Sequence, residues 1–205
     1  VGSASLSVGA YSQASGPRAI SIGQGSVSSG RDSLASGTGA KAEGWGSVAT
    51  GYQAHTLGYD SIAQGTRAFA EGYQSIATGI DSHAARQSVA TGPAAVASGI
   101  GSTAISARAV AEGQNSIAVG VDSKATAYDS IALGTQSLAS YTGAVAIGRG
   151  AQAIADPTVA LGDGAVASAS NAVALGASST ASATNSVALG YGSVADQANT
   201  VSVGA

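Results

Sequence analysis

Glycine recurs every seven residues along most of this chain, and that period constrains its fold more than any other feature. The run extends from Gly2 to Gly79, slips by one residue, and resumes from Gly92 to Gly204. It contains 22 of the 30 glycines, and the other eight each stand two places after a position of this seven-residue lattice. Because a fixed period marks repeat architectures, the sequence predicts a solenoid in place of an ordinary globular core.

The complete repeat has 14 residues in two unequal halves. Late in the chain glycine is kept only at every second lattice position, for example at Gly134 and Gly148, with Tyr141 between them. We name the half-repeat that ends in such a retained glycine half A, and the other one half B. In both halves the residues four and two places before the lattice position are Ser, Ala or Thr throughout. This alternation predicts one short strand per half-repeat, with the small residues on one face.

The small face has to lie inside a narrow roll. Only two turn residues link successive strands, and so short a link cannot span the ~10 Å that separates sheets packed through large side chains. We therefore expect an all-β fold, a repetitive parallel β-roll (solenoid) of about 14 coils with two short strands per coil. A single domain of this kind is expected over residues 1–205, with a one-residue slip in register near residues 86–92.

Composition excludes several classes of function. Charged residues make up 9% of the chain and aromatic residues 4%, and there is no Cys for disulfides or thiolate chemistry. The net charge of −3 provides no basic surface for nucleic acid or for an anionic membrane, so neither is an expected partner. No apolar run approaches the ~20 residues that a membrane helix needs. We expect any membrane anchor to lie outside this stretch of chain.

The outward face of half A predicts self-association. Three places before the lattice position, half A is apolar in 14 of 15 repeats, whereas half B is apolar in seven of 14. In the later coils the residue just before the lattice glycine is apolar as well, which exposes a stripe larger than soluble monomers usually carry. Identical chains packed around a common axis would cover it, at about 1.5–3 kcal/mol for each buried Val or Leu. The expected interface core consists of Ile117, Val119, Ile131, Leu133, Val145, Ile147, Val159, Leu161, Val173, Leu175, Val187, Leu189, Val201 and Val203.

The segments 115–120 and 185–190 carry a family resemblance. Both read Asn-Ser, then Ile or Val, then Ala, then Val or Leu, then Gly, and the pattern recurs at fixed spacing over essentially the whole chain. The chain therefore resembles the head repeats of trimeric autotransporter adhesins, the YadA-like family. The resemblance implies a left-handed β-roll, a homotrimer, type V secretion to a bacterial outer-membrane surface, and attachment to a host extracellular-matrix protein or cell-surface receptor. The repeat residues of that family are chiefly structural, so no binding residue carries over from the motif.

The sequence offers little for catalysis, and we expect neither an enzyme nor a bound metal or cofactor. His55 and His83 stand in the same half-B column but two coils apart, roughly 10 Å at the usual strand spacing, with Phe69 between them. Bonds from zinc to its ligands are only about 2 Å long, so the two imidazoles could not share one ion. Ser, His and Asp are all present, but serine fills the repeat and does not mark a catalytic triad.

Aromatic residues supply the strongest candidate for a contact surface. Trp45, Tyr59 and Tyr73 are 14 residues apart, so stacked coils would make them neighbours on one edge, while Tyr52 lies in the other turn. Such a ladder can stabilise the edge of a solenoid without any ligand, and exposed Trp and Tyr can also serve recognition. Both interpretations stay open. The candidate contact residues are Lys41, Trp45, Tyr52, His55, Tyr59, Arg67, Tyr73 and His83.

Three functions fit a surface solenoid of this kind. The preferred one is an adhesin head, a rigid rod whose repeated weak contacts combine by avidity. The second is a structural spacer within a trimeric surface fibre, with ligand binding elsewhere. The third, a solenoid enzyme or an ice-binding protein, is disfavoured because the half-B face mixes Lys, His, Phe, Gln and Val and offers neither clustered acids nor a regular Thr array.

Overall fold

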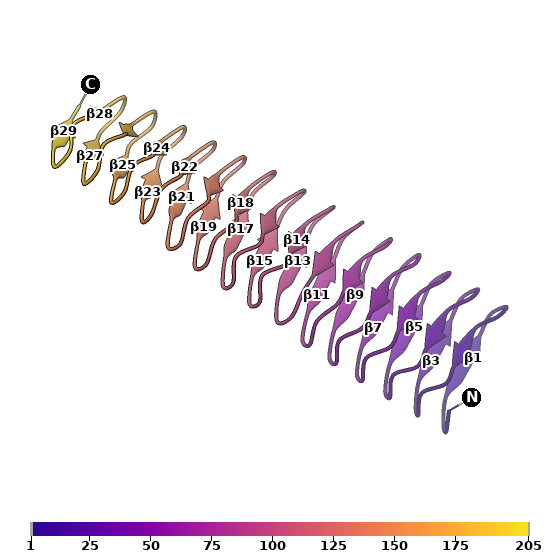
Figure 1. The fold of residues 1–205 in the computed structure, drawn as a ribbon. Coiled ribbons are helices and arrows are strands. Elements are labelled where there is room, and N and C mark those ends of the chain that lie inside the picture. Colours follow the sequence, from indigo (N-terminus) through magenta and orange to yellow (C-terminus); the bar gives the residue numbers. More distant parts are fainter. Residues whose placement is uncertain (1, 205) are drawn as a thin grey trace. The chain divides into compact units, whose positions relative to one another are not determined.

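The structure is a computed structural model that describes residues 2–204, and in this range it contains 29 short strands and no helix (Figure 1). A membrane-spanning helix is accordingly absent from these residues. The strands of half A are β1 (Leu6–Val8), β3 (Ile20–Ile22), β5 (Leu34–Ser36), β7 (Val48–Thr50), β9 (Ile62–Gln64), β11 (Ile76–Thr78), β13 (Val89–Thr91), β15 (Thr103–Ile105), β17 (Ile117–Val119), β19 (Ile131–Leu133), β21 (Val145–Ile147), β23 (Val159–Leu161), β25 (Val173–Leu175), β27 (Val187–Leu189) and β29 (Val201–Val203).

The strands of half B alternate with these along the chain and are one residue shorter. They are β2 (Gln13–Ala14), β4 (Val27–Ser28), β6 (Lys41–Ala42), β8 (His55–Thr56), β10 (Phe69–Ala70), β12 (His83–Ala84), β14 (Val96–Ala97), β16 (Val110–Ala111), β18 (Lys124–Ala125), β20 (Leu138–Ala139), β22 (Gln152–Ala153), β24 (Val166–Ala167), β26 (Thr180–Ala181) and β28 (Val194–Ala195).

The chain forms two compact units, the first ending at Gly101 and the second beginning at Ser102. In each unit the half-A strands pair with one another in parallel, and the half-B strands form a second parallel sheet. Partners in neighbouring strands are 14 residues apart, as Ile117 and Ile131 are in half A and Lys41 and His55 in half B. Within each unit, therefore, successive coils stack in register, and the predicted parallel β-solenoid with two strands per 14-residue coil is confirmed.

The first unit contains one shorter coil. Ile76 pairs with Val89 and His83 pairs with Val96, so both sheets advance here by 13 residues. The missing residue belongs to the turn after β12. There the Ser88 backbone N–H donates to the Ala85 carbonyl at 3.3 Å, whereas in an ordinary turn the equivalent N–H donates to the lattice residue, as Ser47 does to Gly44. Strand pairing on both sides stays in register because a turn absorbs the deletion and a strand does not.

The interior of each unit is built from the smallest side chains. The middle residue of nearly every half-A strand and the second residue of every half-B strand is Ala, Ser or Thr with almost no exposed surface. Thr56 and Thr158 are the largest side chains that are fully buried. The predicted narrow interior is thus confirmed, because no fully buried side chain among residues 2–204 is larger than Thr.

Backbone geometry explains why the later coils keep glycine at only every second lattice position. The glycines that follow half-A strands have strongly positive φ angles, such as 134° at Gly120 and 129° at Gly134, and L residues rarely adopt this conformation. A Cβ atom on Gly134 would lie 2.5 Å from the carbonyl oxygen of Gly148, but one on the half-B glycine Gly113 would lie 1.8 Å from that of Ala127, so the φ angle and not the space distinguishes the two halves. Lattice residues after half-B strands lack this positive φ, so Ala127 can stand there.

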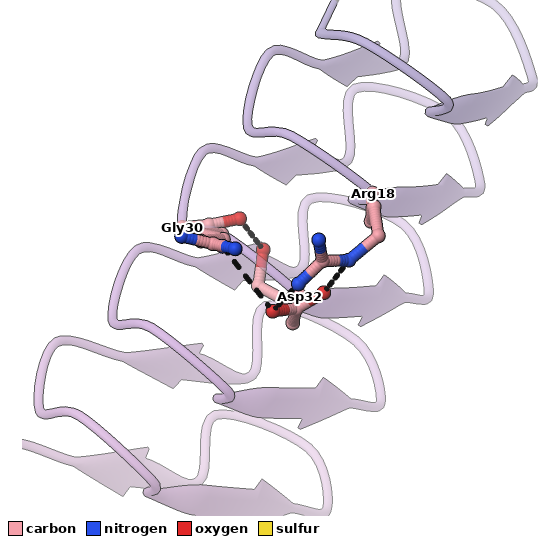
Figure 2. A network of polar contacts seen from close by, with 5 residues as sticks. Arg18, Gly30 and Asp32 are labelled. Atoms are coloured by element: carbon pink, nitrogen blue, oxygen red, sulfur yellow. Dashed lines mark hydrogen bonds and ion pairs between the residues drawn. The ribbon is translucent and has the colours of Figure 1, made fainter.

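Side chains stabilise each turn and also link one coil to the next. Serines three places after a lattice position donate to its carbonyl, as Ser47 Oγ does to Gly44 at 2.7 Å. Arg18 donates two hydrogen bonds to Asp32, which occupies the same turn position one coil later (Figure 2). The hydrogen bonds from Arg18 hold the pKa of the Asp32 carboxyl below its ordinary value. We call such an arginine–aspartate pair an inter-coil clasp.

Candidate contact surface

Four consecutive half-B strands of the first unit gather most of the predicted contact residues on one outward face. β6, β8, β10 and β12 pair so that Lys41, His55, Phe69 and His83 form one column. For the first three of these, the residue two places further on is exposed on the same face, and Trp45, Tyr59 and Tyr73, four places further on in the turns, are exposed as well. We define the aromatic patch as Lys41, Glu43, Trp45, His55, Leu57, Tyr59, Phe69, Glu71, Tyr73 and His83.

Phe69 is held between two histidines. Its ring centroid lies 5.3 Å from that of His55 and 5.1 Å from that of His83, with interplanar angles of 26° and 14°. Each histidine Nε2 is 3.0 Å from a carboxylate oxygen of the preceding coil, His55 from Glu43 and His83 from Glu71. These contacts fix both imidazoles in orientation and keep them on opposite sides of the phenyl ring.

This arrangement bears on metal binding. Phe69 separates the two histidines, and each of them faces a single glutamate at hydrogen-bonding distance. Across residues 2–204 no group of three or more His, Cys, Asp or Glu side chains is placed to hold an ion. The patch presents stacked rings and hydrogen-bonded side chains.

The turn residues of the patch form a partial stack. The rings of Trp45 and Tyr59 are stacked with centroids 5.6 Å apart and planes inclined by 28°. Trp45 is 57% exposed, Tyr59 54% and Tyr73 43%, so stacking leaves about half of each side chain in solvent. In the described part of the chain the stack does not continue to Tyr73. The predicted ladder is therefore two rings in contact and a third in the next turn.

Two predicted contact residues lie on the opposite edge of the roll, in the turns that follow half-A strands. Tyr52 is half exposed there. Arg67 forms an inter-coil clasp with Asp81, donating from Nε and from a terminal nitrogen at 2.6 Å each. The hydrogen bonds from Arg67 hold the pKa of the Asp81 carboxyl below its ordinary value. Because its hydrogen-bonding edge is committed to Asp81, that edge of Arg67 is not free to bind a ligand.

The structure adds two apolar members to the predicted set. Phe69 connects the histidines, and Leu57 is 40% exposed between the coils that carry Glu43 and Glu71. Both carry a sequence signal, since most other half-B strands present Val, Gln, Thr or Ser in these outward columns.

The half-A face forms the second outward surface. In the second unit every predicted interface residue occupies an outward position of strands β17 to β29, and in β17 to β27 the residue between them is an alanine with no exposed surface. Leu161, Leu175 and Leu189 are 37%, 37% and 39% exposed, a large fraction for leucines in the middle of a sheet. Their role as the core of an interface between copies stays a prediction.

Comparison with known proteins identifies the repeat. The sequence profile of the YadA head domain repeat (2 copies) matches nine segments, residues 2–26, 28–54, 57–82, 85–105, 111–137, 125–151, 139–165, 153–179 and 181–205. Among solved structures, the chain is similar to the collagen-binding domain of the Yersinia adhesin YadA at 21% identity, over all of this chain and 83% of that one, with a TM-score of 0.37. No curated protein gives a significant match.

Proposed function

The chain belongs to the family of YadA head domain repeats, and from this premise we propose that it is the head of a bacterial surface adhesin that attaches to host extracellular matrix or host cells. The observation that carries the proposal is the aromatic patch. Trp, Tyr, Phe and His side chains are concentrated on four neighbouring coils of a chain with only 4% aromatic residues. Such a concentration on a solvent-facing sheet is typical of recognition surfaces.

Self-association, proposed from the half-A stripe, fits the same function. The half-A stripe would be covered by identical chains around a common axis, and we take three copies as the assembly. A partner that fills the stripe at every coil needs apolar residues at the same axial spacing of ~4.8 Å, and a parallel copy of the chain has that spacing. A homotrimer would display the aromatic patch three times on one rigid particle. Weak contacts then combine through effective concentration, which can raise overall affinity by about 10²–10⁴.

The patch is suited to a protein ligand. Trp45 and Tyr59 present large rigid surfaces at small cost in conformational entropy, and Leu57 adds apolar area beside them. Glu43 and Glu71 are charged neighbours on the same face. Apolar centres with a polar rim are the usual anatomy of interfaces between proteins. Residue types and placement thus favour a matrix protein or receptor over a small molecule.

The proposal is tested by adhesion of the purified head to immobilised collagen and fibronectin and to cultured cells. A variant with Trp45→Ala, Tyr59→Ala and Tyr73→Ala should lose at least tenfold in apparent affinity, because hot-spot side chains each contribute more than about 1 kcal/mol. The matched control replaces three exposed tyrosines of the second unit, Tyr128, Tyr141 and Tyr191, by Ala and should bind as the parent does.

A structural spacer is the competing function. The stacks within the patch are satisfied without a ligand, as a purely structural surface would be. If the parent binds a surface and the triple Ala variant binds it equally well, the patch is structural. If the parent binds none of the surfaces, the adhesin proposal fails for this segment and the spacer is favoured.

A further inference from the structure

A shallow depression of about 330 Å³ opens on the half-B sheet of the first unit, beside the turns that follow the half-A strands. Three successive coils line it: Gly25 comes from the first, Gly39 and Lys41 from the next, and Gln53 and His55 from the third. Both glycines occupy the second turn position, with φ of 63° and 67°. Most other turns carry a side chain there, so these two glycines leave the space open.

The lining contains two side chains with free donors, Lys41 and Gln53, and no acid; the carboxylate of Glu43 lies 3.0 Å from Nε2 of the lining residue His55. Lys41 is exposed, and in residues 2–204 none of the ion pairs involves its ammonium group. The Gln53 amide supplies two further donors. His55 forms a wall, because its Nε2 is held 3.0 Å from Glu43 and its ring is stacked on Phe69. A cation and an amide beside a vacant space are suited to a small anionic group.

We propose that this depression binds a single carboxylate of a partner polypeptide, the side chain of a Glu or Asp. The ammonium of Lys41 and the amide N–H of Gln53 donate to the carboxylate oxygens, and Gly25 and Gly39 provide the room for its entry. The inference rests on the proposed adhesin function and adds a chemical selectivity to it: among matrix polypeptides, the head selects those with an accessible acidic side chain.

Charge distinguishes a carboxylate from a sulfated polysaccharide. The chain has 8 Lys and Arg against 11 Asp and Glu, and densely sulfated chains require several cations in a row. Near the depression the other cation is Arg67, whose guanidinium is committed to Asp81. One free ammonium with one amide matches one carboxylate in charge and in donor number.

The fold itself provides a matched pair of variants. Gly25 and Gly150 occupy the same turn position, with φ of 63° and 65°, and neither has an atom within 4 Å of an added Cβ. Asp is compatible with this position, since Asp81 and Asp122 adopt φ of 56° and 57° there. Gly25→Asp fills the depression and repels an anion, whereas Gly150→Asp adds the same charge far along the sequence from it. Lys41→Gln removes the cation.

The test is biolayer interferometry of the intact assembled head against two densely displayed peptides, one with Glu at every third position of a Gly–Ser background and one with Gln. We expect the parent and Gly150→Asp to prefer the Glu peptide by about tenfold, and Lys41→Gln and Gly25→Asp to lose that preference. Thermal melting confirms that all variants fold. Equal binding of both peptides by the parent, or an unchanged preference in Lys41→Gln, overturns the inference.

Two further outcomes keep this inference separate from the adhesin proposal. If heparin competes at concentrations where an equally charged Glu peptide does not, the ligand is sulfated, and the proposal of a carboxylate ligand is overturned. If the head adheres to matrix-coated surfaces through the aromatic patch while Gly25→Asp and Lys41→Gln adhere normally, the adhesin function stands and the carboxylate site is overturned. Adhesion reduced in both variants but not in Gly150→Asp supports both.

Discussion

Replacing Phe69 by Ala tests how much the stack at the centre of the aromatic patch contributes to stability. The phenyl ring makes two stacked contacts, at 5.3 Å and 5.1 Å, and each such contact is worth about 0.5–1.5 kcal/mol. Phe69 is half-buried, so the lost burial adds about 1 kcal/mol. The sum predicts a loss of about 2–4 kcal/mol in the free energy of unfolding. For a chain of this length that corresponds to a decrease in Tm of about 5–15 °C.

The assay is thermal and urea unfolding followed by circular dichroism, at one protein concentration so that self-association contributes equally in every sample. Phe69→Leu retains most of the apolar burial and isolates the stacking contribution. The matched control is Val166→Ala, which removes a half-buried side chain from the same column in the second unit, where no aromatic ring stacks on it. If Phe69→Ala lowers Tm no more than Val166→Ala does, the stack contributes nothing and the reasoning is refuted.

Four further changes probe the roll itself. Ala160→Leu inserts three carbons at a fully buried position and should lower the free energy of unfolding by about 1–3 kcal/mol, which urea unfolding would show as a lower midpoint. An unchanged midpoint would contradict the narrow interior. Leu161→Asp, one residue further, should leave the coil folded but separate the copies, because an unpaired charge would be buried between them. Light scattering should then report the mass of one chain. A mass equal to that of the parent would place the interface elsewhere. Gly134→Ala should cost about 1–3 kcal/mol because it forces Ala into a φ of 129°, and equal stability in urea would contradict the explanation given for its retention. Asp81 has a pKa below its ordinary value of 3.8, so its pair with Arg67 stabilises the fold fully above that pH and progressively less as the pH falls through the lowered pKa. Acidification should therefore lower the Tm of Asp81→Asn less than it lowers the Tm of the parent. If Tm falls equally with pH in both proteins, this clasp contributes nothing to the pH dependence.

Strand and turn positions could be predicted from the sequence because they depend on local periodicity. Strand positions follow from a two-residue alternation, turns follow from a seven-residue lattice, and both depend on neighbours a few residues apart. The same alternation assigned the inward and outward faces, because nothing larger than Thr fits between sheets so close together. The half-A stripe and the aromatic columns could be located for the same reason, since residues 14 apart had to become neighbours.

Side-chain contacts between neighbouring coils could not be predicted from the repeat. Nothing in the spacing indicates that His55 and His83 would turn toward Phe69, or that each would meet a glutamate of the preceding coil. These contacts depend on side-chain torsions, which the repeat leaves free on an outward face. The commitment of Arg67 to Asp81 likewise required both turn conformations to be known.

The sequence by itself determined the repeat, the two strands of each coil and the face that each side chain occupies, because these follow from short-range periodicity and from the size of the interior residues. Tertiary structure alone decided which side chains stack or pair across coils, why the later coils retain glycine after half-A strands and not after half-B strands, and where two side-chain-free turns open a depression beside Lys41. Those features depend on φ angles and on distances between residues one coil apart, which a repeat pattern specifies only as neighbours.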